Sequence, residues 1–110
     1  MNTSMLTFLD DASFDDAVAP GSGTVAVEFT AEWCGACKVL APALEQVARE
    51  LDGRVRFHAI DADVNPRVAT RYAVRALPTV LVFRDGELVD RIVGAVSAGV
   101  LRSRLEVGDQ

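Results

Sequence analysis

The chain has 110 residues, half of them hydrophobic, and a formal net charge of −5. This length suits one compact domain that buries a core without metal ions or disulfide staples, so we expect residues 1–110 to form a single domain. The charge argues against general binding to nucleic acid or anionic lipid, and the sequence has no run of roughly 18 apolar residues that could span a membrane.

The first ten residues lack the basic start and the long apolar run of a secretory signal. We therefore expect a cytoplasmic protein. Thiols stay reduced in that compartment, where two cysteines close in sequence are commonly catalytic or metal-binding. Two cysteines are also too few for a stabilising disulfide framework, so their role is sought in chemistry.

The first half of the chain is typical of strands alternating with helices. Residues 4–8 fit a short edge strand, and a helix that carries Phe14, Ala17 and Val18 is expected next. Three residues before that helix offer capping groups: Asp10, Asp11 and Ser13. Residues 20–23 (PGSG) end the helix. Residues 24–30 (TVAVEFT) have the β-branched, apolar pattern of a strand buried on both faces, except for Glu28.

The second half opens with a long helix over residues 34–51, whose apolar residues recur at helical spacing. The expected elements that follow are a strand at 54–60, a helix at 65–72, a hairpin of strands 79–83 and 87–93, and a helix from 97 to about 107. Three side chains of the last helix are expected to point inward: Val100, Leu101 and Leu105. The order βαβαβαββα predicts the α/β class, with one mixed sheet of about five strands flanked by about four helices.

The segment WCGACK (33–38) joins the buried strand to the long helix. A cysteine in a first helical turn faces unpaired backbone N–H groups and the positive end of the helix dipole, which favour its thiolate. Cys37 follows Cys34 by three residues, on the same side of the helix and within reach of a disulfide. Gly35 and Ala36 are small, so a substrate chain can approach Cys34 closely.

This placement predicts a dithiol–disulfide cycle. We expect the Cys34 thiolate to attack a substrate disulfide and form a mixed disulfide. Cys37, expected to be the more buried of the two, then attacks Cys34 and releases the reduced substrate. Two alternatives stay open. One is a zinc site, but such a site needs four ligands and His58 is the only other soft candidate besides the two cysteines. The other is a chance pair of core cysteines.

Across nearly the whole chain the sequence resembles the thioredoxin family. Besides the cysteine motif, the matching positions include Ser13-Phe14-Asp15, Val27-Glu28-Phe29, Ala31-Glu32-Trp33, Ala41-Pro42, Asn65-Pro66, Leu77-Pro78-Thr79, Asp85-Gly86-Glu87 and Val93-Gly94-Ala95. The resemblance implies the thioredoxin fold and a protein-disulfide reductase that works through the Cys34–Cys37 disulfide, with no bound cofactor and no metal. It also implies disulfide-containing protein substrates and electrons from NADPH through a flavoprotein thioredoxin reductase. Nothing in the sequence calls for more than a monomer.

The resemblance also assigns a substrate-binding surface. Pro78 matches the family's cis proline beside the disulfide, and the backbone of Leu77 is expected to pair with an extended substrate. The alternative is that Pro78 only begins a strand. An apolar rim for substrates and the reductase is implied at Trp33, Ala76, Leu77, Val93, Gly94 and Ala95, with simple packing as the alternative for any one of them.

Four positions depart from the family's pattern. Glu28 stands at a position behind the second cysteine where the family commonly has Asp. We expect burial to raise the pKa of Glu28 and expect its carboxyl to relay the proton of Cys37. The alternative is that the carboxyl is solvated or otherwise satisfied. Ala59 stands where the family commonly has Lys, so Glu28 should be easier to protonate. Ala36 replaces a usual Pro, which predicts a less reducing potential, and Thr30 replaces a usual Trp, which widens the surface beside the site.

The sequence therefore predicts a general protein-disulfide reductase. Two other functions are carried as alternatives. One is a specialised or more oxidising thioredoxin-like protein, and the other is a thioredoxin-fold binding or chaperone module with idle cysteines. No function is assigned to His58, which fits packing or surface, or to Asp61 and Asp63, which we expect to satisfy loop backbone groups.

Overall fold

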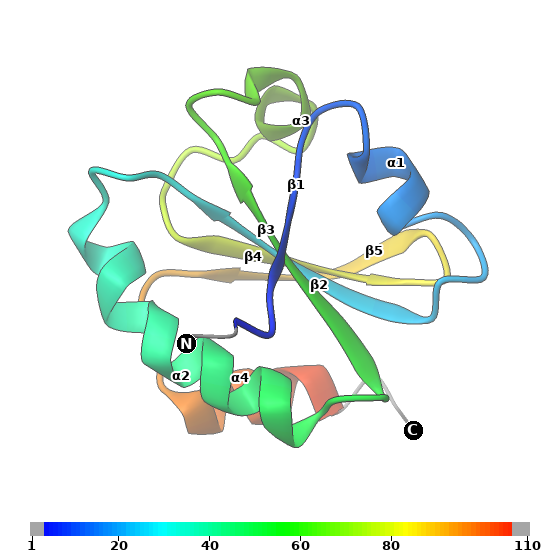
Figure 1. The fold of residues 1–110 in the computed structure, drawn as a ribbon, viewed down its shortest axis with the longest axis vertical. Helices are drawn as coiled ribbons and strands as arrows, with labels where there is room; N and C mark the ends of the chain where they lie inside the picture. Colours follow the sequence, from blue (N-terminus) through cyan, green and yellow to red (C-terminus); the bar gives the residue numbers. More distant parts are fainter. Residues whose placement is uncertain (1–3, 107–110) are drawn as a thin grey trace.

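The computed structural model describes residues 4–106, which form one mixed sheet with helices on both faces (Figure 1). In chain order the elements are β1 (Thr7–Leu9), α1 (Phe14–Ala17), β2 (Thr24–Thr30), α2 (Gly35–Glu50), β3 (Val55–Asp61), α3 (Pro66–Arg71), β4 (Thr79–Arg84), β5 (Glu87–Val93) and α4 (Ala98–Glu106). The predicted order and the α/β class are confirmed. Within this part of the chain no helix has the length and apolar character needed to cross a membrane.

The sheet has the strand order β1-β3-β2-β4-β5. The β1–β3 and β2–β3 pairs are parallel, and the β2–β4 and β4–β5 pairs are antiparallel. The last pair is a hairpin closed by Asp85 and Gly86, both with positive φ, at 49° and 89°. Two central residues with positive φ make the two-residue turn that suits the twist of a hairpin, and Gly accepts that conformation without strain.

Strand β2 is buried on both faces, as its apolar run predicts. Val25, Val27 and Phe29 pack with Phe14 of α1 and with α3, whereas Ala26 packs under α2 and α4. Because side chains alternate along a strand, Glu28 projects to the same face as Ala26, toward α2. The first turn of α2 follows directly after this strand, so the fold brings the cysteine motif to the carboxyl end of β2.

Three local expectations were wrong: the start of the first strand, the inward direction of Val100, and the capping of the first helix. Strand β1 starts at Thr7 rather than residue 4, because Met5 N–H donates to Glu45 Oε1 of α2 (2.9 Å) instead of joining the sheet. Val100 is 41% exposed, because α4 buries the i, i+4 stripe of Leu101 and Leu105 and turns the neighbouring position to solvent. The predicted helix end at residue 107 lies outside the described residues.

The third error concerns capping. Asp10 and Ser13 do make reciprocal bonds before α1: Ser13 N–H donates to Asp10 Oδ1 (2.8 Å), and Asp10 N–H donates to Ser13 Oγ (3.0 Å). Asp11 does not join them. Its carboxylate instead accepts hydrogen bonds from Arg67 N–H (3.3 Å) and Val68 N–H (3.0 Å), so it caps α3 from a distant part of the chain.

Candidate active site

The two cysteines lie at the first turn of α2 and are joined as a disulfide, with their Cα atoms 5.3 Å apart. Cys34 is the N-cap residue of α2, in an extended conformation, and its Sγ accepts a hydrogen bond from Cys37 N–H (3.1 Å). An orphan N–H of the first turn therefore points at the sulfur that the sequence predicts to be the nucleophile. Both the pairing and its position at the helix start are as the motif predicts.

Burial does not distinguish the two sulfur-bearing residues. Cys34 is 3% exposed and Cys37 is 5% exposed, so the expectation that Cys37 is the more buried was wrong. The reason is that both side chains belong to one small cluster with Ala31, against which Leu77 packs. The two cysteines differ instead in position, because Cys34 is the N-cap residue of α2 and Cys37 lies inside its first turn.

The loop before β4 lies against this cluster. Its Leu77–Pro78 peptide bond is cis, as the resemblance implies. Two hydrogen bonds hold the loop: Thr79 Oγ1 donates to the Ala76 carbonyl (2.6 Å), and Gly94 N–H donates to the Pro78 carbonyl (2.9 Å). The second bond ties the segment after β5 to the segment that touches the cysteines.

The residues of the expected apolar rim differ in exposure. Trp33 is 69% exposed and lines a shallow groove with Leu77, Val74 and Arg75. Ala76, Val93 and Ala95 are exposed as well, and Gly94 is half-buried. The Gly94–Pro78 hydrogen bond connects residues 93–95 to the loop that packs against the cysteines.

Asp63 was missed as a site residue. Its Oδ2 accepts a hydrogen bond from Trp33 Nε1 (2.5 Å), which fixes the exposed indole beside the cysteine motif. The two residues are 30 positions apart, and no spacing in the sequence links them. Asp61 behaves as expected, since its Oδ1 accepts from Asp63 N–H (2.9 Å) and Val64 N–H (3.4 Å) within the loop.

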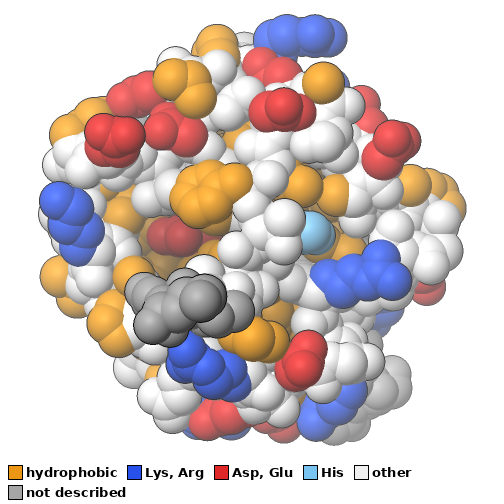
Figure 2. All heavy atoms as spheres, viewed as in Figure 1, with side chains coloured by type: hydrophobic (Ala, Val, Ile, Leu, Met, Phe, Trp, Pro, Cys, Tyr) orange, Lys and Arg blue, Asp and Glu red, His pale blue; other side chains and the backbone are white. Residues whose placement is uncertain are grey.

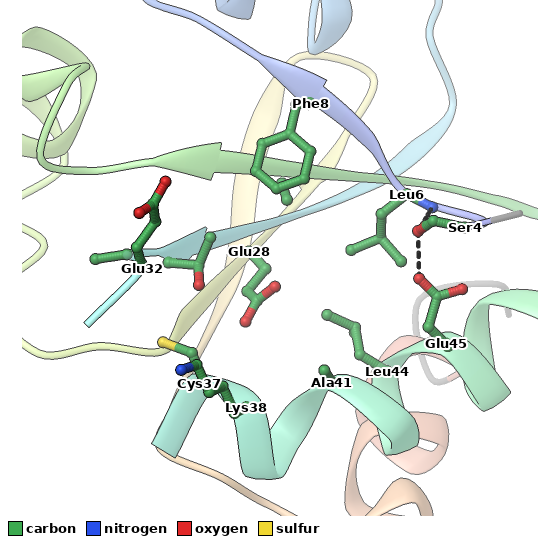
Figure 3. Close-up of a pocket in the computed structure, with 13 residues that line it drawn as sticks. Ser4, Leu6, Phe8, Glu28, Glu32, Cys37, Lys38, Ala41, Leu44 and Glu45 are labelled. Carbon is green, nitrogen blue, oxygen red and sulfur yellow. Dashed lines mark hydrogen bonds between the residues drawn. The ribbon is translucent and has the colours of Figure 1, made fainter. Parts of the chain in front are cut away.

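Glu28 lies behind the second cysteine. Its side chain is 7% exposed, and both it and Cys37 line a pocket of about 240 Å³ between β1, β2, β3 and α2. Burial raises the pKa of Glu28 to about 7, as its apolar strand predicts. Figure 3 shows the Glu28 carboxyl directed from β2 into this pocket, between Phe8 on one side and α2 on the other.

Small side chains leave this pocket open. Ala59, the register partner of Glu28 in β3, lines it and carries no charge that could pair with the acid. Thr30 of β2 lines it too. Figure 2 shows a hollow on this face with acidic side-chain atoms at its floor and apolar side chains around it. No pattern in the sequence predicted this pocket, because its walls come from four elements, several of them distant in sequence.

His58 stays outside the site. Its Nδ1 lies 3.2 Å from the Thr7 carbonyl at the β1–β3 pair, and burial lowers its pKa. Among residues 4–106 no three His, Cys, Asp or Glu side chains gather in a group that could hold a metal ion.

Comparisons with known proteins agree with this geometry. The family model described as Thioredoxin matches residues 5–107. A thioredoxin of Synechocystis sp. is 38% identical over 98 residues, which cover 89% of this chain and 92% of that protein. Thioredoxin 1 of Synechococcus elongatus is 37% identical over 103 residues, covering 94% and 96%. The chloroplastic M-type thioredoxin of Pisum sativum is 37% identical over 98 residues. The matched segment is 89% of this chain but only 57% of that protein's length.

Proposed function

The chain belongs to the thioredoxin family of thiol–disulfide oxidoreductases, and from this premise we propose how its own residues reduce a protein disulfide. The observation that carries the proposal is the Cys34–Cys37 disulfide at the start of α2, where Cys37 N–H donates to Cys34 Sγ. A sulfur in that position is stabilised as a thiolate by the N–H group and by the helix N-terminus.

In the first step the reduced chain reacts through Cys34. Its thiolate attacks one sulfur of the substrate disulfide, the substrate S–S bond breaks, and a mixed disulfide forms between Cys34 and that sulfur. The other substrate sulfur leaves as a thiolate. Gly35, which has no side chain, and the small Ala36 are both exposed and leave room for the substrate backbone at this stage.

In the second step Glu28 acts as the base. It takes the proton of the Cys37 thiol, and the Cys37 thiolate attacks Cys34 Sγ. The mixed disulfide breaks, the second substrate thiolate leaves, and Cys34 and Cys37 end as the disulfide that the structure contains. Two electrons have then passed to the substrate. A carboxyl whose pKa is about 7 suits proton transfer near neutral pH.

The substrate lies on the surface built from Trp33 and the loop before β4. Trp33 offers an exposed indole held by Asp63, and the exposed Ala76 with the half-buried Leu77 offers backbone to an extended substrate segment. Pro78, Val93, Gly94 and Ala95 complete the surface by family analogy. This assignment is supported by the packing of Leu77 against the two cysteines.

We infer the setting from the family and from the sequence. A flavoprotein thioredoxin reductase returns Cys34 and Cys37 to the dithiol state with electrons from NADPH. Residues 1–110 act as one monomeric domain in the cytoplasm, without affinity for nucleic acid or membranes, in keeping with the charge of −5. The chain itself uses its cysteine pair in place of a bound cofactor.

Reduction of a protein disulfide in dithiothreitol buffer tests the proposal. The wild-type chain should accelerate the reaction, and the Cys34→Ser/Cys37→Ser double variant should reduce substrate no faster than buffer. If the double variant kept the acceleration, the chain would act by binding rather than by redox chemistry. Replacing dithiothreitol with NADPH and a flavoprotein thioredoxin reductase tests the electron supply separately.

A further inference from the structure

The pocket beside Cys37 holds a buried acid that has no hydrogen-bond or ion-pair partner among the described residues. Glu28 is 7% exposed, and within residues 4–106 no hydrogen bond or ion pair reaches its carboxyl; burial is the only influence on its pKa. A carboxylate in such a place has lost most of its hydration and has received no donor in exchange. A donor that enters the pocket could therefore bond a carboxyl to which the described residues supply no donor.

The walls of the pocket are mainly apolar. Five apolar side chains from β1, α2, β3 and the segment before β1 line it: Leu6, Phe8, Ala41, Leu44 and Ala59. Phe8 is well exposed although it is aromatic, so its ring is available to a ligand. The volume of about 240 Å³ falls below the roughly 300 Å³ at which sites for drug-sized ligands begin, so the pocket suits a fragment-sized molecule.

The charges around the pocket favour a cation. Besides Glu28, the charged residues that line it are Glu32 after β2 and Lys38 and Glu45 of α2, which makes three acids and one base. Glu45 is already engaged, because it accepts hydrogen bonds from Ser4 Oγ and from Met5 N–H. In the described part of the chain no ion pair joins Lys38 to Glu28. Glu32 is exposed to solvent, so Glu28 is the buried acceptor at the pocket (Figure 3).

We propose that this pocket binds a small organic ammonium ion with an apolar body. The ammonium group donates to the Glu28 carboxylate, and the apolar body lies against Phe8, Ala41 and Leu44. A neutral molecule of the same shape would leave the carboxylate unsatisfied, and an anion would meet the acids at the pocket. Neither Trp33 nor Leu77 lines this pocket, and the proposed site stands whether or not Glu28 takes part in catalysis.

Titration with benzylammonium chloride, followed by NMR on the oxidised chain, tests the proposal. Amide signals of residues at the pocket, such as Glu28, Leu44 and Ala59, should shift with the probe. Benzyl alcohol, the neutral match, should bind at least about tenfold more weakly. Because the pKa of Glu28 is about 7 and the probe stays protonated, binding should be about tenfold tighter at about pH 8 than at about pH 6.

Two variants place the probe at the pocket. Glu28→Gln should abolish both the preference for the ammonium ion and the pH dependence. Ala41→Phe, a change at an exposed helix position that lines the pocket, should block binding without disturbing the core, whereas Ala12→Phe, exposed and away from the pocket, should not. The proposal is overturned if the probe shifts no pocket residue, if benzyl alcohol binds equally well, or if Glu28→Gln leaves the ammonium preference intact.

Discussion

Glu28 and Ala59 are register partners in the parallel strands β2 and β3, and both line the pocket that reaches Cys37. The residue beside the buried acid therefore supplies neither a cation nor a hydrogen-bond donor from its side chain. Burial alone acts on the carboxyl, and its pKa rises to about 7. The Glu28 carboxyl therefore titrates near neutral pH beside the second cysteine. Replacing it should change both the turnover and the stability of the protein.

The first prediction concerns turnover. Glu28→Gln removes the base while keeping the shape of the side chain, so reduction of a protein disulfide at about pH 7 should slow on the order of a hundredfold, the low end of the range for general acid–base catalysis. The wild-type rate should show a titration near the pKa of about 7 that the variant lacks. Glu45→Gln is the matched control, because Glu45 lines the same pocket but is engaged by Ser4 and Met5. An unchanged pH–rate profile in Glu28→Gln would remove Glu28 from the mechanism.

The second prediction concerns stability. The pKa of Glu28 is raised in the folded state from 4.5 to about 7, so the folded chain binds the proton more tightly than the unfolded chain. Stability linked to this group is complete below about pH 4.5 and is lost as the pH rises to about 7. Glu28→Gln, which cannot ionise, should therefore be more stable than wild type by up to about 3 kcal/mol at about pH 8, and should match it near pH 4.5. Urea unfolding of the oxidised proteins at both pH values checks this, and a difference independent of pH would contradict it.

A third prediction concerns the redox balance. Ala36 is an exposed residue in the first turn of α2, where a proline is tolerated because the N–H groups have no partner within the helix. Ala36→Pro should restrain this turn in the conformation that carries the disulfide and so favour the oxidised state. The reduction potential should become more negative, and about 30 mV would correspond to a tenfold change in the equilibrium constant. Equilibration with glutathione buffers measures it; a shift to less negative values would show that the turn is not what sets the potential.

A fourth prediction concerns the cap on α3. Asp11→Ala removes the acceptor for Arg67 N–H and Val68 N–H and should lower the free energy of unfolding by about 1 kcal/mol. Asp52→Ala, at an exposed position after α2, is the control and should change it by less than about 0.5 kcal/mol. Equal effects of the two substitutions would mean that the cap does not stabilise the fold.

Local patterns predicted most of the fold. The apolar run of residues 24–30 identified a strand buried on both faces, and the expected hairpin of residues 79–93 is present as β4 and β5. These features depend on neighbours in sequence, which periodicity and turn chemistry report directly. The inward direction of Val100 was wrong, because the choice between adjacent apolar positions depends on which stripe of α4 meets the sheet.

Contacts between distant residues could not be predicted. Asp11 caps a helix that lies 56 residues further along the chain, and Asp63 fixes an indole 30 residues before it. The same limit applies to the pocket, whose walls join Phe8 of β1 to Ala41 of α2. The equal burial of Cys34 and Cys37 belongs here as well, since the loop of Leu77 that packs against both is far away in sequence.

The most direct test of the central account is to trap the mixed disulfide. The account predicts that Cys37→Ser, which keeps the attacking thiol and lacks the resolving one, accumulates a covalent complex through Cys34 with a disulfide-containing protein, visible by mass spectrometry and released by dithiothreitol. Cys34→Ser should form no such complex at a comparable rate. If Cys34→Ser trapped the substrate through Cys37 and Cys37→Ser did not, the roles assigned to the two sulfurs would be reversed.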